Sequence, residues 1–275
     1  MNADVKGPEQ VTQNSVSARV ALKRQINVMH AVILRDIRSR FFSHGLGFLI
    51  APLFPVAHIV ILLTIYTATS RTAIFGDDLK LFFATGLVPV LTITYISRFM
   101  SSSLLANKSM LAFPAVRLID IVLARSILEF LAIVISTFLI VIILMGFGTS
   151  PAPYFPYEAF ICMVFTAVLA VGIGIVVSVI TAIFPIASMV YAFSTVIIYL
   201  ASGAPIYLEA LPAKIVYICS FNPAFQAVAW MRSAYYMGYP TQYLDKTYLL
   251  MWAICSLAVG LLMERSLRQY ILSGR

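Results

Sequence analysis

Few side chains in this sequence could do acid–base, nucleophilic or metal chemistry, and those few stand apart from one another. The nitrogen and sulfur candidates are His30, His44, His58, Cys162, Cys219 and Cys255. Their spacing fits neither a metal site nor a disulfide framework, and we interpret the cysteines as small apolar residues. The phosphate-binding loop GxxxxGKS/T, the metalloprotease motif HExxH and a nucleophile elbow do not occur in the sequence. We therefore expect no catalytic residue, no metal and no cofactor bound to this chain.

Carboxylates inside apolar segments are the next candidates, because they normally mark a proton or ion relay. Glu129 is the main one, and it lies one helical turn after Arg125 on the same helix face. Arg98 is a second candidate partner for Glu129. The spacing favours a structural ion pair near the cytoplasmic interface over a relay. His58 also lies in an apolar segment, where hydrogen-bonded packing is favoured over a functional role.

The elements that must position these residues follow from the composition. Of the 275 residues, 61% are hydrophobic and 11% are charged, whereas a soluble domain carries about 25% charged residues. So few charges exclude a soluble enzyme, a nucleic-acid-binding module and a disordered protein. Apolar runs near 20 residues are typical of membrane-spanning helices rather than barrel strands. The sequence thus predicts an all-α integral membrane protein with a net charge of +8.

Six apolar runs are predicted to cross the membrane, because each is near or above the length that ~30 Å of hydrocarbon requires. They cover residues 46–69, 80–104, 117–147, 158–183, 186–203 and 247–266. Of the 19 Lys and Arg residues, the side away from the termini has only Arg71, Lys80, Lys214, Arg232 and Lys246. The positive-inside rule therefore places both termini in the cytoplasm, which agrees with an even number of spans.

Three further segments have their own patterns. Residues 1–19 are polar and predict a flexible cytoplasmic tail, while 44–275 form the membrane domain. Residues 20–43 predict an amphipathic helix in the membrane interface, with a soluble packed helix as the alternative. Residues 204–246 contain two pieces too short to cross a bilayer, which predicts re-entrant or interfacial helices on the outer face. One of them starts at Asn222–Pro223, an N-cap followed by proline at the first helical position.

The cytoplasmic connection at residues 105–116 is the most informative loop. Residues 107–125 read NKSMLAFPAVRLIDIVLAR, a partly apolar segment interrupted by Pro114. A short helix between two spans could dock into a cleft on a partner protein. A plain loop followed by a helix start explains the same residues, so the two interpretations stay open.

The membrane portion as a whole resembles the permease subunit of type-2 ABC exporters. It is most similar to the inner-membrane permeases of bacterial capsular polysaccharide and O-antigen export. The resemblance runs in one order from VILRDIRSRFF and GLGFLIAPLFPVAH, through residues 107–125, to NPAFQAVAWMRSAYYMGYPTQYLDKTYLL. The family pattern in the last stretch falls on Asn222, Pro223, Arg232, Tyr243, Asp245 and Tyr248. Where the family commonly has His and Glu, this sequence has Gln226 and Ala229.

The resemblance implies a homodimer in the bacterial inner membrane that exports a lipid-linked, capsular-type polysaccharide. Two copies of a separate ABC ATPase would bind ATP and Mg, so this chain is not an enzyme by itself. A periplasmic polysaccharide co-polymerase, an outer-membrane exporter and membrane lipids are further implied partners, and nucleic acid is not. The implied coupling residues are Asn107, Lys108, Leu111, Phe113, Pro114, Arg117, Asp120, Arg35 and Arg38.

A glycan needs a polar or aromatic path, because an aliphatic wall cannot replace its hydration. We expect the path and outer gate at Tyr199, Tyr207, Phe221, Trp230, Arg232, Tyr235, Tyr236 and Tyr239. Interfacial anchoring enriches the same aromatic residues, so both roles stay open. Arg232 could meet an anionic sugar, or it could cap or pair with Asp245.

Two other functions are alternatives. Permeases of the same superfamily export a lipid, a drug or a teichoic-acid-like polymer, and the adjacent genes would distinguish these substrates from a capsular polysaccharide. A membrane-embedded enzyme, such as a lipid-linked glycosyltransferase, needs a cluster of carboxylates at one membrane face. The candidates are Asp77, Asp78 and Asp120, and the Asp77–Asp78 pair lacks a third ligand. The scarcity of intramembrane charge disfavours ion-coupled transport and leaves the energy source to a partner chain.

Overall fold

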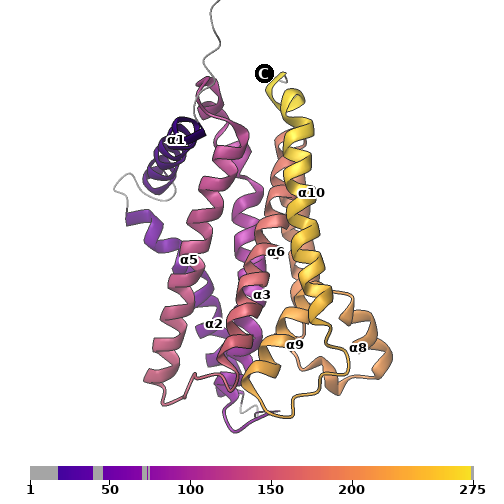
Figure 1. The fold of residues 1–275 in the computed structure, drawn as a ribbon. Helices are drawn as coiled ribbons and strands as arrows, with labels where there is room; N and C mark the ends of the chain where they lie inside the picture. Colours follow the sequence, from indigo (N-terminus) through magenta and orange to yellow (C-terminus); the bar gives the residue numbers. More distant parts are fainter. Residues whose placement is uncertain (1–17, 40–45, 70–72, 74, 274–275) are drawn as a thin grey trace, which may run out of the picture.

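The computed structural model of this chain describes residues 18–39, 46–69, 73 and 75–273. The described part is helical and contains no strand, which confirms the prediction of an all-α protein for those residues. The long helices form a bundle (Figure 1). Helix α1 (Ala18–Ser39) and the C-terminal end of α10 (Lys246–Ser273) lie at one end, and α8 (Ala213–Ser220) and α9 (Pro223–Tyr235) lie at the other. The predicted tail, apart from its last two residues, and residues 40–43 of the predicted interface helix lie outside the described residues.

Five helices in the described part are long and apolar enough to cross a membrane. They are α2 (Ile50–Ala68), α3 (Leu79–Ser101) with its continuation α4 (Ser103–Ala106), α5 (Leu118–Gly146), α6 (Pro156–Ile183) and α10. The fifth predicted span is shorter than expected. Its helix α7 (Ala187–Leu200) has 14 residues, so it is roughly 21 Å long. Pro185 precedes this helix, and Gly203, with a φ of +78°, turns the chain shortly after it.

Helix α3 is the centre of the bundle. It packs against α2, α5, α6, α7 and α9, and most of its side chains are buried. Helices α6 and α10 pack closely through glycine. A Cβ atom on Gly172 would lie 2.5 Å from the backbone nitrogen of Leu257, so only glycine allows this approach. Helix α3 thus contacts α9 at one end of the bundle and α4 at the other.

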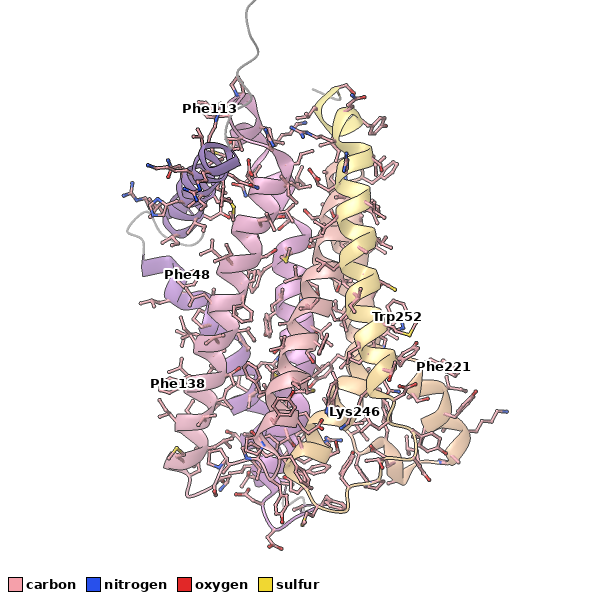
Figure 2. All side chains as sticks on the ribbon, viewed as in Figure 1. Phe48, Phe113, Phe138, Phe221, Lys246 and Trp252 are labelled. Carbon is pink, nitrogen blue, oxygen red and sulfur yellow. The ribbon has the colours of Figure 1, made fainter. Side chains whose placement is uncertain are left out.

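Large apolar side chains point outward along the spans. Phe138 of α5 is 65% exposed and Trp252 of α10 is 43% exposed, and both lie on the outside of the bundle (Figure 2). A soluble protein rarely exposes so much apolar surface, whereas a hydrocarbon environment favours it. The exposed surface therefore agrees with an integral membrane protein.

Two irregular segments cap the bundle. At the α1 end, α4 is followed by the 3-10 helix η2 (Lys108–Ala112) and an extended turn up to the start of α5. At the opposite end, residues 204–246 contain η3 (Leu208–Ala210), α8 and α9. Helix α9 packs against α3, α6 and α10, so it is held inside the bundle rather than lying on its surface.

Candidate functional site

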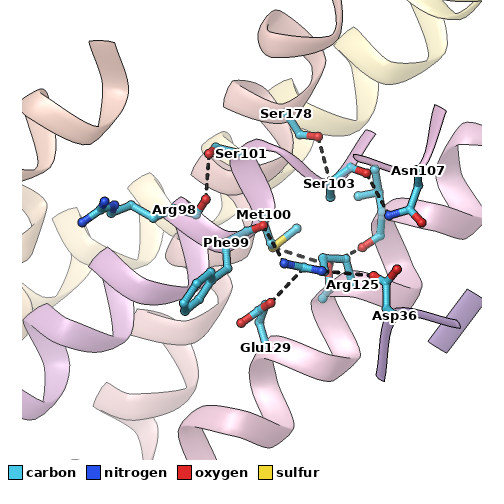
Figure 3. Close-up of polar contacts among 12 residues, drawn as sticks. Asp36, Arg98, Phe99, Met100, Ser101, Ser103, Asn107, Arg125, Glu129 and Ser178 are labelled. Atoms are coloured by element: carbon cyan, nitrogen blue, oxygen red, sulfur yellow. Dashed lines mark hydrogen bonds and ion pairs between the residues drawn. The ribbon is translucent and has the colours of Figure 1, made fainter. Parts of the chain in front are cut away.

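A buried ionic cluster lies where α1 meets the bundle (Figure 3). Arg125 Nε lies 2.9 Å from Glu129 Oε1, which is the contact that the i,i+4 spacing predicts. The guanidinium also donates through Nη1 to Asp36 Oδ2 at 3.1 Å and through Nη2 to the carbonyl oxygen of Phe99 at 3.1 Å. Arg98, the other candidate partner, is exposed and points away from Arg125 in Figure 3. One arginine thus joins α1, α3 and α5.

Asp36 is a functional candidate that the sequence reasoning missed. It is 5% exposed, although it lies on a helix predicted to rest at the membrane interface. A signal was present, because Asp36 is the only acidic residue in the 22 residues of α1. Its partner, however, is Arg125 of α5 rather than one of the neighbouring bases on α1.

The predicted coupling segment is anchored by some of its residues and presents others. Arg35 Nη1 donates to Asn107 Oδ1 at 2.6 Å, and the buried Asn107 amide donates to the carbonyl oxygen of Ser103 at 3.0 Å. Leu111 is buried, whereas Phe113 is 60% exposed and lies at the α1 end in Figure 2. Lys108, Pro114, Arg117 and Arg38 are also exposed. The segment therefore offers a mixed apolar and basic surface beside α1.

Two of the aspartates considered for an enzyme have structural tasks instead. Asp120 accepts a hydrogen bond from the backbone N–H of Arg117 at 3.0 Å, and Asp78 accepts one from that of Lys80 at 2.8 Å, so each caps a helix start. Burial raises the pKa of Asp78, but hydrogen bonds from Thr149, Lys80 and Leu81 together outweigh it and hold the pKa below its ordinary value. The described residues contain no cluster of three metal-ligating side chains.

The start of α9 matches the predicted cap. Asn222 Oδ1 accepts from the N–H of Ala224 at 3.0 Å, and its amide donates to the carbonyl oxygen of Ile198 at 2.9 Å. Gln226, one of the departures from the family pattern, is buried and fully bonded. It donates to the carbonyl oxygens of Ser220 and Tyr243 at 2.7 and 3.1 Å and accepts from Asp245 N–H at 2.8 Å. Gln226 therefore ties α9 to the segment before α10.

The structure buries part of the predicted glycan path. Trp230 and Arg232 of α9 are buried because the bundle encloses this helix, and Tyr239, in the segment after α9, is buried as well. Arg232 lies over the ring of Phe82, 4.2 Å from its centre, and donates to the carbonyl oxygen of Ala204 at 3.4 Å. The candidate ion pair or cap between Arg232 and Asp245 is not the arrangement found.

The helix cap and the polar contacts in this region are formed without Arg232. Asp245 caps α10 by accepting from the N–H of Tyr248 at 3.0 Å. Trp230 Nε1 and Lys246 Nζ both bond Glu158 Oε2, at 2.6 and 2.7 Å. Burial raises the pKa of the Tyr239 hydroxyl, which donates to Glu209. Of the remaining predicted aromatics, Phe221 is exposed, and Tyr199, Tyr207, Tyr235 and Tyr236 are partly buried.

A polar surface lies between α2, α3 and α7 inside the apolar bundle. His58 Nδ1 lies 3.3 Å from the Tyr95 hydroxyl, and the His58 and Tyr199 rings are 5.7 Å apart. Between α7 and α3, the Tyr191 hydroxyl also donates to Ser97 Oγ at 2.6 Å. All but Ser97 keep part of their side-chain surface exposed. Such groups at membrane depth normally face a water-filled space or another subunit rather than lipid.

Comparison with known proteins defines the class of protein. Residues 27–236 match the sequence profile of the ABC-2 type transporter family. The match covers more than half of the chain and includes α2 to α9. This chain belongs to the ABC-2 type transporter family.

Characterised relatives narrow the comparison. The chain is 28% identical over 261 residues to the polysialic acid transport protein KpsM of Escherichia coli, covering 94% of this chain and 100% of KpsM. It is 24% identical over 246 residues to the capsule polysaccharide export inner-membrane protein CtrC of Neisseria meningitidis, covering 88% and 92%. It is 23% identical over 249 residues to the capsule polysaccharide export inner-membrane protein BexB of Haemophilus influenzae, covering 90% and 93%.

Proposed function

We propose that this chain is the inner-membrane permease of an ATP-driven exporter of capsular polysaccharide. Its family and the names of its relatives, which cover nearly their whole length, support this function. The sequence lacks a phosphate-binding loop, so ATP hydrolysis is the task of a separate ATPase subunit. The chain then contributes the translocation path and the surface that receives the movement of the ATPase.

The observation that carries the proposal is the polar surface formed by His58, Tyr95, Tyr191 and Tyr199. Hydroxyl and imidazole groups can hydrogen-bond a hydrated glycan, and their rings can stack on sugar faces. Facing lipid, the same groups would lose hydrogen bonds to water at a cost of several kcal/mol each. We infer that this surface lines the polysaccharide path.

A second copy of the chain would close that path. A single copy leaves the surface between α2, α3 and α7 open on one side, so a homodimer that faces two such surfaces toward each other encloses a polar channel. In this arrangement α7 provides the sixth crossing, since it carries the chain from the end of α6 back toward α9. Both termini then lie in the cytoplasm, in agreement with the distribution of Lys and Arg.

The ATPase would bind at the α1 end. Phe113 offers an exposed apolar side chain there, and the exposed Lys108 and Arg38 add positive charge at the same end. Phe113 is the residue to test, because it is exposed and adds nothing to the core. Phe113→Ala should weaken co-purification of the ATPase, whereas Phe138→Ala, on the outside of α5, should leave it unchanged.

Genetic deletion tests the function itself. We expect loss of surface polysaccharide on deletion, with the polymer retained inside the cell and export restored by the intact gene. We also expect the purified chain to bind an ABC ATPase and to hydrolyse no ATP alone. Normal surface polysaccharide after deletion, with loss of a lipid or a teichoic-acid-like polymer instead, would assign the alternative export function.

Cysteine labelling tests the path. In a background with Cys162, Cys219 and Cys255 replaced by serine, we expect a membrane-impermeant thiol reagent to modify a His58→Cys variant and block export. The matched control is Phe138→Cys, which places its thiol in hydrocarbon, where a charged reagent does not react. Labelling of the Phe138 variant but not of the His58 variant would reverse the assignment of the two surfaces.

A further inference from the structure

Asp36 occupies an unusual position for an acidic residue on an interface helix. Its side chain is 5% exposed, and Asp36 Oδ2 accepts from Arg125 Nη1 at 3.1 Å. Arg125 is itself buried and also contacts Glu129 and the carbonyl oxygen of Phe99. Asp36 is thus the side chain by which α1 joins an ionic cluster built on α3 and α5 (Figure 3).

Arg125 keeps a carboxylate partner without Asp36, and this distinguishes the role of Asp36 from simple charge balance. Arg125 and Glu129 already form a neutral pair within one helix, and the Phe99 carbonyl oxygen satisfies a further donor. Asp36 adds a second carboxylate to Arg125. Burying a carboxylate costs free energy even when it is paired, so the neutralisation of Arg125 does not by itself account for Asp36.

The preceding residue reaches a different element from the same turn of α1. Arg35 donates to Asn107 Oδ1 at 2.6 Å and to Ser109 Oγ at 3.3 Å, both in the predicted coupling segment. Asn107 is bonded in turn to Ser103, and Ser103 Oγ lies 2.9 Å from Ser178 Oγ of α6. Two adjacent residues therefore connect α1 to the coupling segment on one side and to the spans on the other.

We propose that Asp36 is a positioning residue for transport, which links α1 to α3 and α5 so that movement of the coupling segment reaches the spans. The inference rests on the proposed function, since it assigns a role in the same export reaction. Arg35 moves α1 with the coupling segment, and Asp36 transfers that displacement to Arg125. Without the Asp36 contact, the ATPase can bind and hydrolyse ATP while the spans no longer follow.

The test compares four forms of the full chain in complex with its ATPase. Asp36→Ala removes the contact but leaves the Arg125–Glu129 pair neutral, so the fold should be retained. Asp36→Asn keeps the size and one oxygen and serves if the alanine variant does not accumulate. Asp36→Glu restores the charge and is the rescue variant. Asn27→Ala, nine residues earlier on α1 and exposed, is the matched control.

The measurements are the amount of assembled complex, ATP hydrolysis and surface polysaccharide. For Asp36→Ala we expect wild-type assembly and ATP hydrolysis but about tenfold less polysaccharide exported per ATP hydrolysed, which is the size of a coupling between linked elements. Asp36→Asn should export an amount between those of Asp36→Ala and wild type. Asp36→Glu and Asn27→Ala should resemble wild type.

Two outcomes would overturn the inference. One is wild-type export by Asp36→Ala. The other is a loss of export and ATP hydrolysis in proportion to the loss of complex, because that identifies a purely structural residue. Failure of the proposed function is a separate result, since the wild-type chain itself would then show neither ATPase association nor export.

Discussion

Removing Arg125 is the strongest perturbation that the ionic cluster allows. Arg125→Met keeps most of the side-chain volume and deletes the charge. Two carboxylates then remain, Glu129 at 2% and Asp36 at 5% relative exposure, without the cation that both contact. Breaking a buried ion pair by deleting one partner costs about 3–5 kcal/mol, because an uncompensated charge remains in a low-dielectric region.

The magnitude converts into a measurable shift of the thermal midpoint. A chain of this size loses about 2–4 °C per kcal/mol, so we expect Arg125→Met to unfold about 10 °C below wild type in the same detergent. A fluorescence-detected thermal unfolding series on purified protein measures the shift. The control is the triple variant Asp36→Asn, Arg125→Met, Glu129→Gln, in which none of these three side chains is charged.

The triple variant separates charge burial from packing. Neutral side chains of similar size can replace a buried ion cluster without loss of stability, so we expect its midpoint within a few degrees of wild type. Its export should still fail, because the link between α1 and α5 is gone. If Arg125→Met unfolds at the wild-type temperature, or the triple variant is as unstable as the single one, the electrostatic account of the cluster is wrong.

Three further predictions concern single contacts. Asp78→Ala should cost about 1 kcal/mol of stability by loss of the α3 cap. Because the pKa of Asp78 is lowered in the folded state, its contribution to stability is present above the ordinary carboxyl pKa and lost as the pH falls through the folded-state pKa. The thermal midpoints of variant and wild type should therefore converge in acid. Gln226→Leu should cost about 1–3 kcal/mol of stability by leaving two carbonyls and one N–H unpaired. Limited proteolysis should then cleave residues 236–245 faster than in wild type, and an unchanged rate would contradict this role. Gly172→Ala should lower the thermal midpoint by pushing α6 from α10, and Gly146→Ala, where a Cβ meets nothing within 4 Å, should not; equal midpoints would refute the packing argument.

The sequence predicts the long helices well because a bilayer imposes a length and an apolar composition on each span. The predicted run 117–147 corresponds to α5 at Leu118–Gly146, and 158–183 corresponds to α6 at Pro156–Ile183. It predicts α7 less well, because hydropathy continues through Leu200 to Gly203, whereas the helix ends where the backbone must turn. Composition thus determines where a helix can lie in a membrane, and local backbone chemistry determines where it stops.

Tertiary contacts account for what the sequence did not reveal. Residues 224–232 of α9 are all buried, although the segment includes the polar Gln226 and Arg232, which are typical of an exposed face. Its aromatic and basic residues were therefore assigned to an exposed path. The same limit applies to Asp36, whose partner Arg125 is 89 residues away in the chain. Glu264 of α10 is a further buried carboxylate, which the sequence reasoning missed when it singled out Glu129.

The place of α3 connects the ionic cluster with the polar surface. Phe99, whose carbonyl oxygen accepts from Arg125, lies one turn after Tyr95, and the rings of Phe99 and Tyr95 stack with their centres 6.0 Å apart. Tyr95 in turn contacts His58 of α2. A displacement of Arg125 therefore acts on the same turn of α3 that carries the polar surface. Because an α-helix is stiff over one turn, we expect a movement received through Asp36 to reach the proposed path without an ion relay within the spans.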